Sequence, residues 1–117
     1  MTNKEIINLY EGLAELYNLK LALNIKVKYT LAKIKIEIEP LYQAVMVTRQ
    51  DLIKQYSTEE NTSFMIKNNM LPQFSAEMDD LMKIEINIEV PKINLEDLDD
   101  SRISIHLIEK LLPIIND

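Results

Sequence analysis

The chain has 117 residues and a formal net charge of −6, with one glycine, one histidine and no cysteine. Hydrophobic residues make up 47% and charged residues 27%, which is typical of a soluble folded chain, and we expect a single domain over residues 1–117. The missing cysteines exclude disulfides and thiol nucleophiles, the single glycine excludes a glycine-rich phosphate loop, and the acidic charge argues against binding nucleic acid through a basic surface.

The first segment has the periodicity of an amphipathic helix, which we predict over Asn3–Leu19. Its apolar residues follow i, i+3, i+4 and i+7 steps and are Ile6, Leu9, Tyr10, Leu13, Leu16 and Tyr17. Thr2 or Asn3 would serve as the N-cap. Gly12 lies inside the helix, where glycine costs up to about 1 kcal/mol relative to alanine.

The stretch KIKIEIEP, Lys33–Pro40, alternates isoleucine with charge as a β-strand does. A wider window shows steps of three and four instead, through Val27, Leu31, Ile34, Ile38, Leu41, Val45 and Leu52. We therefore predict one long helix over about 25–56, with Ile36 off the stripe. Pro40 cannot donate to the carbonyl of Ile36, so the helix either kinks or restarts with Pro40 at its first position.

The next segments are shorter and more polar. STEENTS, Ser57–Ser63, is predicted as a loop, and Phe64–Lys67 as a short strand. Helical spacing returns over Leu71–Met82, where Pro72 suits the first turn.

The stretch KIEINIEVP, Lys83–Pro91, repeats the alternation without any helical stripe, so we predict a strand that pairs with Ser63–Lys67 as an antiparallel ribbon. An acidic connector leads to a helix over Ile105–Ile115, capped by Ser104. The predicted fold class is α+β and helix-dominated, with a long proline-kinked helix, shorter helices and a small antiparallel β element.

No group of residues suggests catalysis. His106 is the sole histidine and has no nucleophile motif near it, so we expect a surface or capping role. The acidic run Leu95–Arg102 lacks the glycine and the distant glutamate of an EF-hand loop, and we expect a solvated connector. We therefore predict no enzyme activity, no catalytic or metal-binding residue and no cofactor.

Two sets of residues are candidate interaction surfaces. The first lies on the long helix, where an off-stripe isoleucine accompanies tyrosine and methionine, side chains that suit adaptable contacts. It consists of Tyr29, Ile36, Tyr42 and Met46. The second is an acidic patch in the connector, formed by Glu96, Asp97, Asp99 and Asp100.

Three segments carry a resemblance to a known group of proteins. Ile38–Tyr56 contains an acid–proline step and the segment RQDLIKQY, Met78–Leu98 contains EINIE and LEDL, and Ile103–Leu112 is a short apolar helix capped by serine. In this order the segments resemble short, functionally unassigned proteins of Gram-positive siphophages and their prophages. The resemblance implies a viral or prophage accessory protein that acts through contacts rather than chemistry.

The leading hypothesis is a non-enzymatic phage or prophage protein that acts through protein–protein interaction, with virion morphogenesis as one setting. We expect it in the host cytoplasm or on the virion, without membrane or nucleic-acid binding, and as a homo-oligomer formed through the long helix. The alternative is an acidic inhibitor of a host nuclease or anti-phage defence protein, which would offer carboxylates in place of phosphates.

Overall fold

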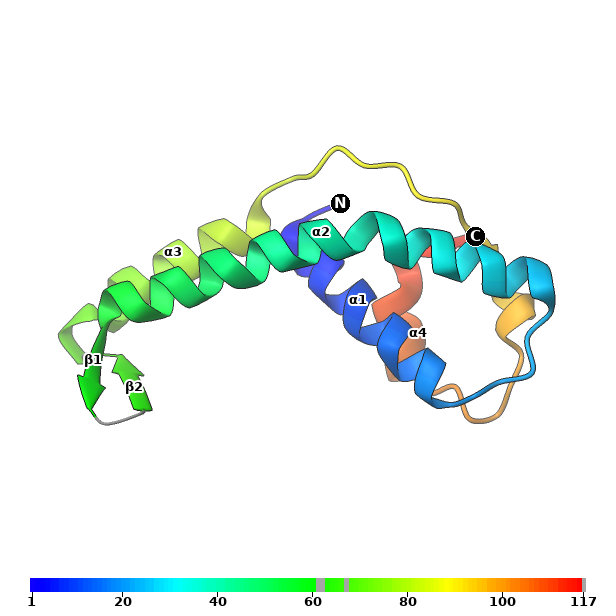
Figure 1. Cartoon of the computed structure of the whole chain (residues 1–117), viewed down its shortest axis with the longest axis horizontal. Coiled ribbons are helices and arrows are strands. Elements are labelled where there is room, and N and C mark those ends of the chain that lie inside the picture. The colour runs from blue at the N-terminus through cyan, green and yellow to red at the C-terminus, as the bar shows by residue number, and fades with distance from the viewer. Residues whose placement is uncertain (61–62, 67, 117) are drawn as a thin grey trace.

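The computed structural model describes residues 1–60, 63–66 and 68–116. The molecule is elongated, with principal extents of 51 × 30 × 22 Å and a radius of gyration of 17.1 Å. A compact domain of this length would have a radius of gyration of about 13 Å. Figure 1 shows the cause: helix α2 (Ile25–Tyr56) runs along the whole molecule, and the other helices pack along it.

Helix α1 (Asn3–Asn18) confirms the first predicted helix and ends one residue before the predicted boundary. Thr2 is its N-cap and forms a capping box with Glu5: the Glu5 N–H donates to Thr2 Oγ1 at 3.2 Å, and the Thr2 N–H donates to Glu5 Oε1 at 3.0 Å. After the helix, Lys20 adopts a left-handed backbone conformation with φ of 52° and turns the chain toward α2.

Helix α2 has the predicted bounds and continues through Pro40 without a break. Asn24 caps its start, where the Val27 N–H donates to Asn24 Oδ1 at 2.9 Å. Pro40 and Ile36 are both exposed, so water reaches the carbonyl that lacks its helical donor. The helix is bowed, with α1 and α4 (Ile105–Leu111) on its concave side (Figure 1).

Two core clusters hold the molecule together. The main cluster joins α1, the first half of α2 and the C-terminal segments, with fully buried side chains that include Leu9, Ile34, Ile38, Leu107, Leu111 and Ile114. The second is smaller and contains Ile7, Val45 and Leu81, with Tyr42, Leu52, Met78 and Met82 packed against it. The apolar stripe of α2 that we expected to support oligomerisation therefore faces the chain's own core.

Strands β1 (Ser57–Glu60) and β2 (Ser63–Ile66) form an antiparallel hairpin in which Ser57 lies opposite Ile66. The prediction of a loop over Ser57–Ser63 is wrong for these strand residues, because backbone pairing overrides their polar character. Positions 61–62 of that loop, and Lys67 of the expected strand, lie outside the described residues. A short 3₁₀ turn, η1 (Asn68–Met70), leads into α3 (Leu71–Lys83), which confirms the predicted helix and has proline in its first turn.

The strand predicted over Lys83–Pro91, and its pairing with Ser63–Lys67, are wrong. Residues 84–92, here called the strap, form no strand: their β-type pairing among the described residues is one isolated bridge between Glu85 and Thr2, the N-cap of α1. Ile88 and Val90 pack against the main core. The alternation of β-branched residues therefore reflects an extended segment that packs one side against the core. It does not reflect a β-sheet, because the ladder of hydrogen bonds between strands is missing.

The C-terminal part is more broken than predicted. It consists of five short elements in chain order: strand β3 (Ile93–Asn94), the 3₁₀ turn η2 (Leu95–Leu98), helix α4 (Ile105–Leu111), the 3₁₀ turn η3 (Leu112–Ile114) and strand β4 (Ile115–Asn116). Ser104 caps α4 as predicted, and its Oγ accepts from the Leu107 N–H at 3.1 Å. The α-helix stops at Leu111 and tightens into η3 instead of continuing to Ile115, because Pro113 has no N–H to donate to the carbonyl one turn earlier.

The predicted fold class, helix-dominated α+β, is confirmed. The β content differs in detail from the expected single antiparallel element. The hairpin is antiparallel, whereas β3 and β4 pair in parallel with Ile93 opposite Ile115. An amide hydrogen bond from Asn116 Nδ2 to Asn94 Oδ1, at 3.1 Å, joins the ends of the parallel pair.

Candidate functional site

Helix α2 carries a second line of residues on the face turned away from the core. We call it the outer stripe, and it consists of Ile25, Tyr29, Ala32, Ile36, Pro40, Gln43 and Val47, all exposed. At about 100° per residue these positions fall within about 80° of one another, on the side opposite Ile34 and Ile38. The stripe spans 25–47, a length of about 33 Å at 1.5 Å per residue. It is a continuous, mainly apolar surface that no other described part of the chain covers.

The outer stripe explains the alternation in KIKIEIEP. Ile34 and Ile38 are completely buried, whereas Ile36 between them is 71% exposed. Two residues along a helix is more than half a turn, so alternating isoleucines point to opposite faces. This segment is a helix with isoleucine on both its core side and its solvent side.

The four residues predicted as an interaction surface do not lie on one face. Tyr29 is 65% exposed and Ile36 belongs to the same stripe. Tyr42 is half-buried at the crossing of α1 and α2, where its ring stacks on Tyr10 with centroids 3.8 Å apart and planes 9° from parallel. Met46 is half-buried as well. The sequence reasoning missed Ile25 and Val47, although both continue the spacing of three and four residues from Ile36.

Charged residues flank the middle of the outer stripe. Lys33 and Lys35 precede Ile36, and Glu37 and Glu39 follow it. Lys33 Nζ lies 5.5 Å from the ring centroid of Tyr29, a cation–π distance. The ion pairs found among the described residues involve other side chains, so these four charges have no ionic partner there.

A groove of about 840 Å³ lies beside the N-terminal half of the outer stripe, between α1 and α2. Its floor is apolar and includes Leu13, Leu16, Leu21 and Leu31. Three lysines, Lys20, Lys28 and Lys35, also line it, and its lining contains no acidic residue. In a chain of net charge −6 this groove is locally basic, and it extends the apolar surface from α2 onto α1.

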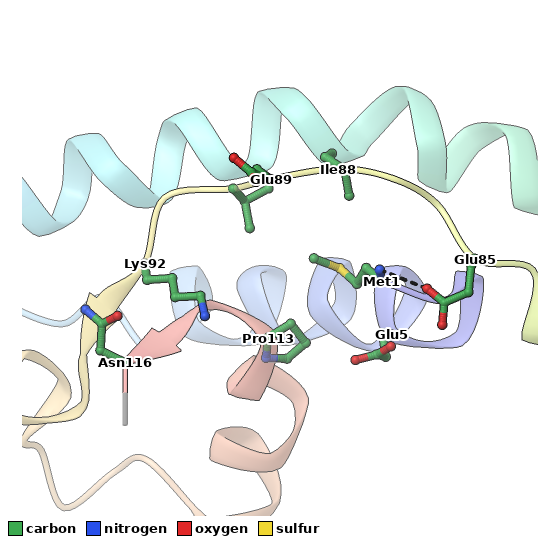
Figure 2. A pocket seen from close by; sticks show the side chains of 9 residues that line it. Met1, Glu5, Glu85, Ile88, Glu89, Lys92, Pro113 and Asn116 are labelled. Carbon is green, nitrogen blue, oxygen red and sulfur yellow. Dashed lines mark hydrogen bonds and ion pairs between the residues drawn. The ribbon is translucent and has the colours of Figure 1, made fainter.

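A second hollow, of about 780 Å³, lies under the strap (Figure 2). The amino group of Met1 bonds Glu85 Oε2 at 3.2 Å and the Ile86 carbonyl at 3.1 Å, which ties the strap to the start of α1. Glu5, which also lines the hollow, is engaged in the capping box. These charged groups stabilise local structure and do not converge on a common point.

The predicted acidic patch is partly used by the fold itself. Asp97 Oδ2 accepts from the Asn94 N–H at 3.4 Å and so caps η2. Asp100 pairs with Arg102, which donates to both carboxylate oxygens at 3.0 Å, and these hydrogen bonds hold the pKa of Asp100 below its ordinary value. Arg102 also donates to the Leu19 carbonyl at 3.2 Å, at the end of α1. Only Glu96 and Asp99 remain exposed and outside these local contacts.

His106 lies in the first turn of α4 with a largely exposed side chain, which confirms the expected surface position. Its Nδ1 is 3.9 Å from a Glu109 carboxylate oxygen, one turn along the helix. Within residues 1–60, 63–66 and 68–116, no three histidine or acidic side chains are grouped so that they could hold a metal ion. In the same residues no helix is long and apolar enough to cross a membrane.

No family model matches the chain, and comparisons with curated proteins and with solved structures found no similar protein.

Proposed function

We propose that this chain is a non-enzymatic interaction protein whose contact surface is the outer stripe of α2. The observation that carries the proposal is the position of Ile36, which is 71% exposed in the middle of an apolar line about 33 Å long. Contiguous exposed apolar surface is characteristic of sites that bind another protein. Burying one such isoleucine or tyrosine contributes about 1.5 to 3 kcal/mol, so a few stripe residues are enough for specific binding.

The biological setting is also part of the proposal. The resemblance of Ile38–Tyr56, Met78–Leu98 and Ile103–Leu112 to siphophage and prophage proteins favours an accessory role in a phage, within the host cytoplasm or on the virion. The earlier alternative, an acidic mimic of nucleic acid, has less support from the geometry. Two of its four carboxylates, Asp97 and Asp100, are already engaged in capping and ion pairing.

The experiment compares a stripe variant with a matched control. Tyr29→Lys/Ile36→Lys places charge on the outer stripe, and Ile105→Lys makes the same change at an isoleucine of α4 that is 78% exposed. Because all three sites are exposed, both variants should fold, which circular dichroism would verify. Complexes would then be compared by sedimentation of the pure proteins and by affinity capture from phage-infected cells.

We expect the unaltered chain and the Ile105→Lys control to form the same complexes and the stripe variant to lose them. Complexes that persist in Tyr29→Lys/Ile36→Lys would overturn the proposal. So would an unaltered chain that remains monomeric and captures nothing above background.

A further inference from the structure

The outer stripe is symmetric in spacing about Ile36. Ala32 and Pro40 lie four residues on either side of it, Tyr29 and Gln43 lie seven, and Ile25 and Val47 lie eleven. When two identical helices pack antiparallel about a twofold axis, residues equally far from the central position face each other across the axis. A stripe with this spacing is therefore complementary to its own copy in reverse orientation.

The charges beside the stripe are antisymmetric about the same residue. Lysines stand one and three residues before Ile36, at Lys35 and Lys33, and glutamates stand one and three residues after it, at Glu37 and Glu39. At about 100° per residue, Lys33 and Glu37 lie on one side of the stripe, and Lys35 and Glu39 lie on the other. Each side thus carries one positive and one negative group.

The orientation of a helix pair decides which charges meet. In an antiparallel twofold pair the same side of each helix comes together, so Lys33 of one copy meets Glu37 of the second, and Lys35 meets Glu39. Each such pair is offset by only about 3 Å along the helix axis. In a parallel pair opposite sides come together, which brings Lys33 against Lys35 and Glu37 against Glu39. Because like charges repel, the pattern favours the antiparallel pair.

We infer that the occupant of the outer stripe is a second copy of this chain, packed antiparallel with Ile36 against Ile36 on a twofold axis. This inference rests on the proposed function and names its partner. All seven stripe residues are exposed, so a second copy can reach the whole line. Two helices that cross at an angle touch mainly near the crossing point, where Ala32, Ile36 and Pro40 lie between the four charged pairs.

The small contact zone implies a weak, concentration-dependent dimer. Sedimentation over a range of concentrations up to about 1 mM should detect it, because weak dimers have dissociation constants in the micromolar to millimolar range. Salt should weaken the dimer, since its flanking pairs are near the surface.

A charge exchange tests the pairing directly. Lys33→Glu/Lys35→Glu leaves four acidic groups at the centre, and Glu37→Lys/Glu39→Lys leaves four basic groups. Each variant alone should self-associate at least about tenfold more weakly than the unaltered chain, because like charges then oppose each other. An equimolar mixture of the two should recover the association, with one copy of each variant in the dimer. Failure of the mixture to recover it would overturn the inference.

Cysteine cross-linking tests the orientation of the two helices. Because the chain has no cysteine of its own, any disulfide must join the introduced residues. A mixture of Tyr29→Cys and Gln43→Cys chains should give the mixed disulfide on mild oxidation. Each chain alone should give none, because position 29 of one copy lies about 21 Å along the axis from position 29 of the other. Preferred 29–29 and 43–43 disulfides would show a parallel pair and overturn the inference.

The outcome also separates this inference from the proposed function. If the unaltered chain stays monomeric at every concentration, but a captured partner is lost in Tyr29→Lys/Ile36→Lys, self-pairing is wrong and the interaction function stands. If that variant retains self-association and every captured partner, both are wrong.

Discussion

Replacing Gly12 by alanine should destabilise the protein, although alanine is the better helix former. Gly12 is buried where α1 packs against α4. A Cβ added there would lie 3.0 Å from Lys110 Cβ and 3.1 Å from Leu111 Cδ2. Carbon atoms prefer about 3.5 to 4.0 Å, so both neighbours would have to move. Leu111 is fully buried, and the Cβ of Lys110 moves only with the backbone of α4.

The size of the effect follows from two opposing terms. Alanine in place of glycine inside a helix stabilises by about 1 kcal/mol. Overpacking a well-filled contact typically costs about 1 to 3 kcal/mol. Gly12→Ala should therefore lower the free energy of unfolding by about 1 kcal/mol, as measured by urea denaturation monitored by circular dichroism.

Ala14, exposed in the same helix, supplies the control. Ala14→Gly meets no packing constraint and should lose only the propensity difference of about 1 kcal/mol. If Gly12→Ala instead raises the free energy of unfolding by the amount that Ala14→Gly lowers it, the close approach of α4 does not destabilise the variant and the reasoning is refuted.

Three further substitutions test local features. Lys20→Gly should raise the free energy of unfolding by about 0.5 to 1 kcal/mol, because glycine adopts a φ of 52° without the strain of a side chain; unchanged urea denaturation would contradict this. Pro40→Ala should raise the melting temperature, because alanine restores the missing N–H donor and removes the ring clash, and proline inside a helix costs up to about 3 kcal/mol relative to alanine. A lower melting temperature would show that the bend is needed for packing. Arg102→Gln should raise the pKa of Asp100 toward the ordinary aspartate value, followed by NMR titration of its carboxyl carbon. Because the pKa of Asp100 is lower in the folded than in the unfolded state, the Asp100–Arg102 pair stabilises the fold at neutral pH, and this stabilisation is lost as the pH falls below about 4. An Asp100 pKa that is identical in the variant would exclude Arg102 as the cause of the shift.

Helical periodicity was the most informative signal in the sequence. It located α2 with its observed bounds and α3 to within one residue, because the core side of each helix must follow a period of 3.6. The strap was misread because alternation reports only that one face is covered. Whether an extended segment finds a hydrogen-bonding neighbour depends on residues far away, here Met1, Thr2 and Asn3, which bond the strap near its start.

The candidate site was predicted in part. Tyr29 and Ile36 lie on the outer stripe, but the spacing that links them to Ile25 and Val47 was overlooked because the core-facing stripe from Val27 to Leu52 already accounted for the helical period. Tyr42 follows the helical period equally well, and only the position of Tyr10 on another helix decides that its ring is stacked and half-buried. Contacts of this kind depend on tertiary packing and leave no local pattern in the sequence.

The division into two core clusters has a consequence for dynamics. Of the described residues, thirteen are buried in the main cluster, but only Ile7, Val45 and Leu81 are buried in the one that holds α3 against α2. Segments that bury little apolar surface open at a lower free energy than the whole fold. Amide hydrogens of α3 should therefore exchange with solvent before those of α1. In such an opened state the far end of α2 would uncover Val45 and Leu52, an apolar surface hidden in the closed molecule.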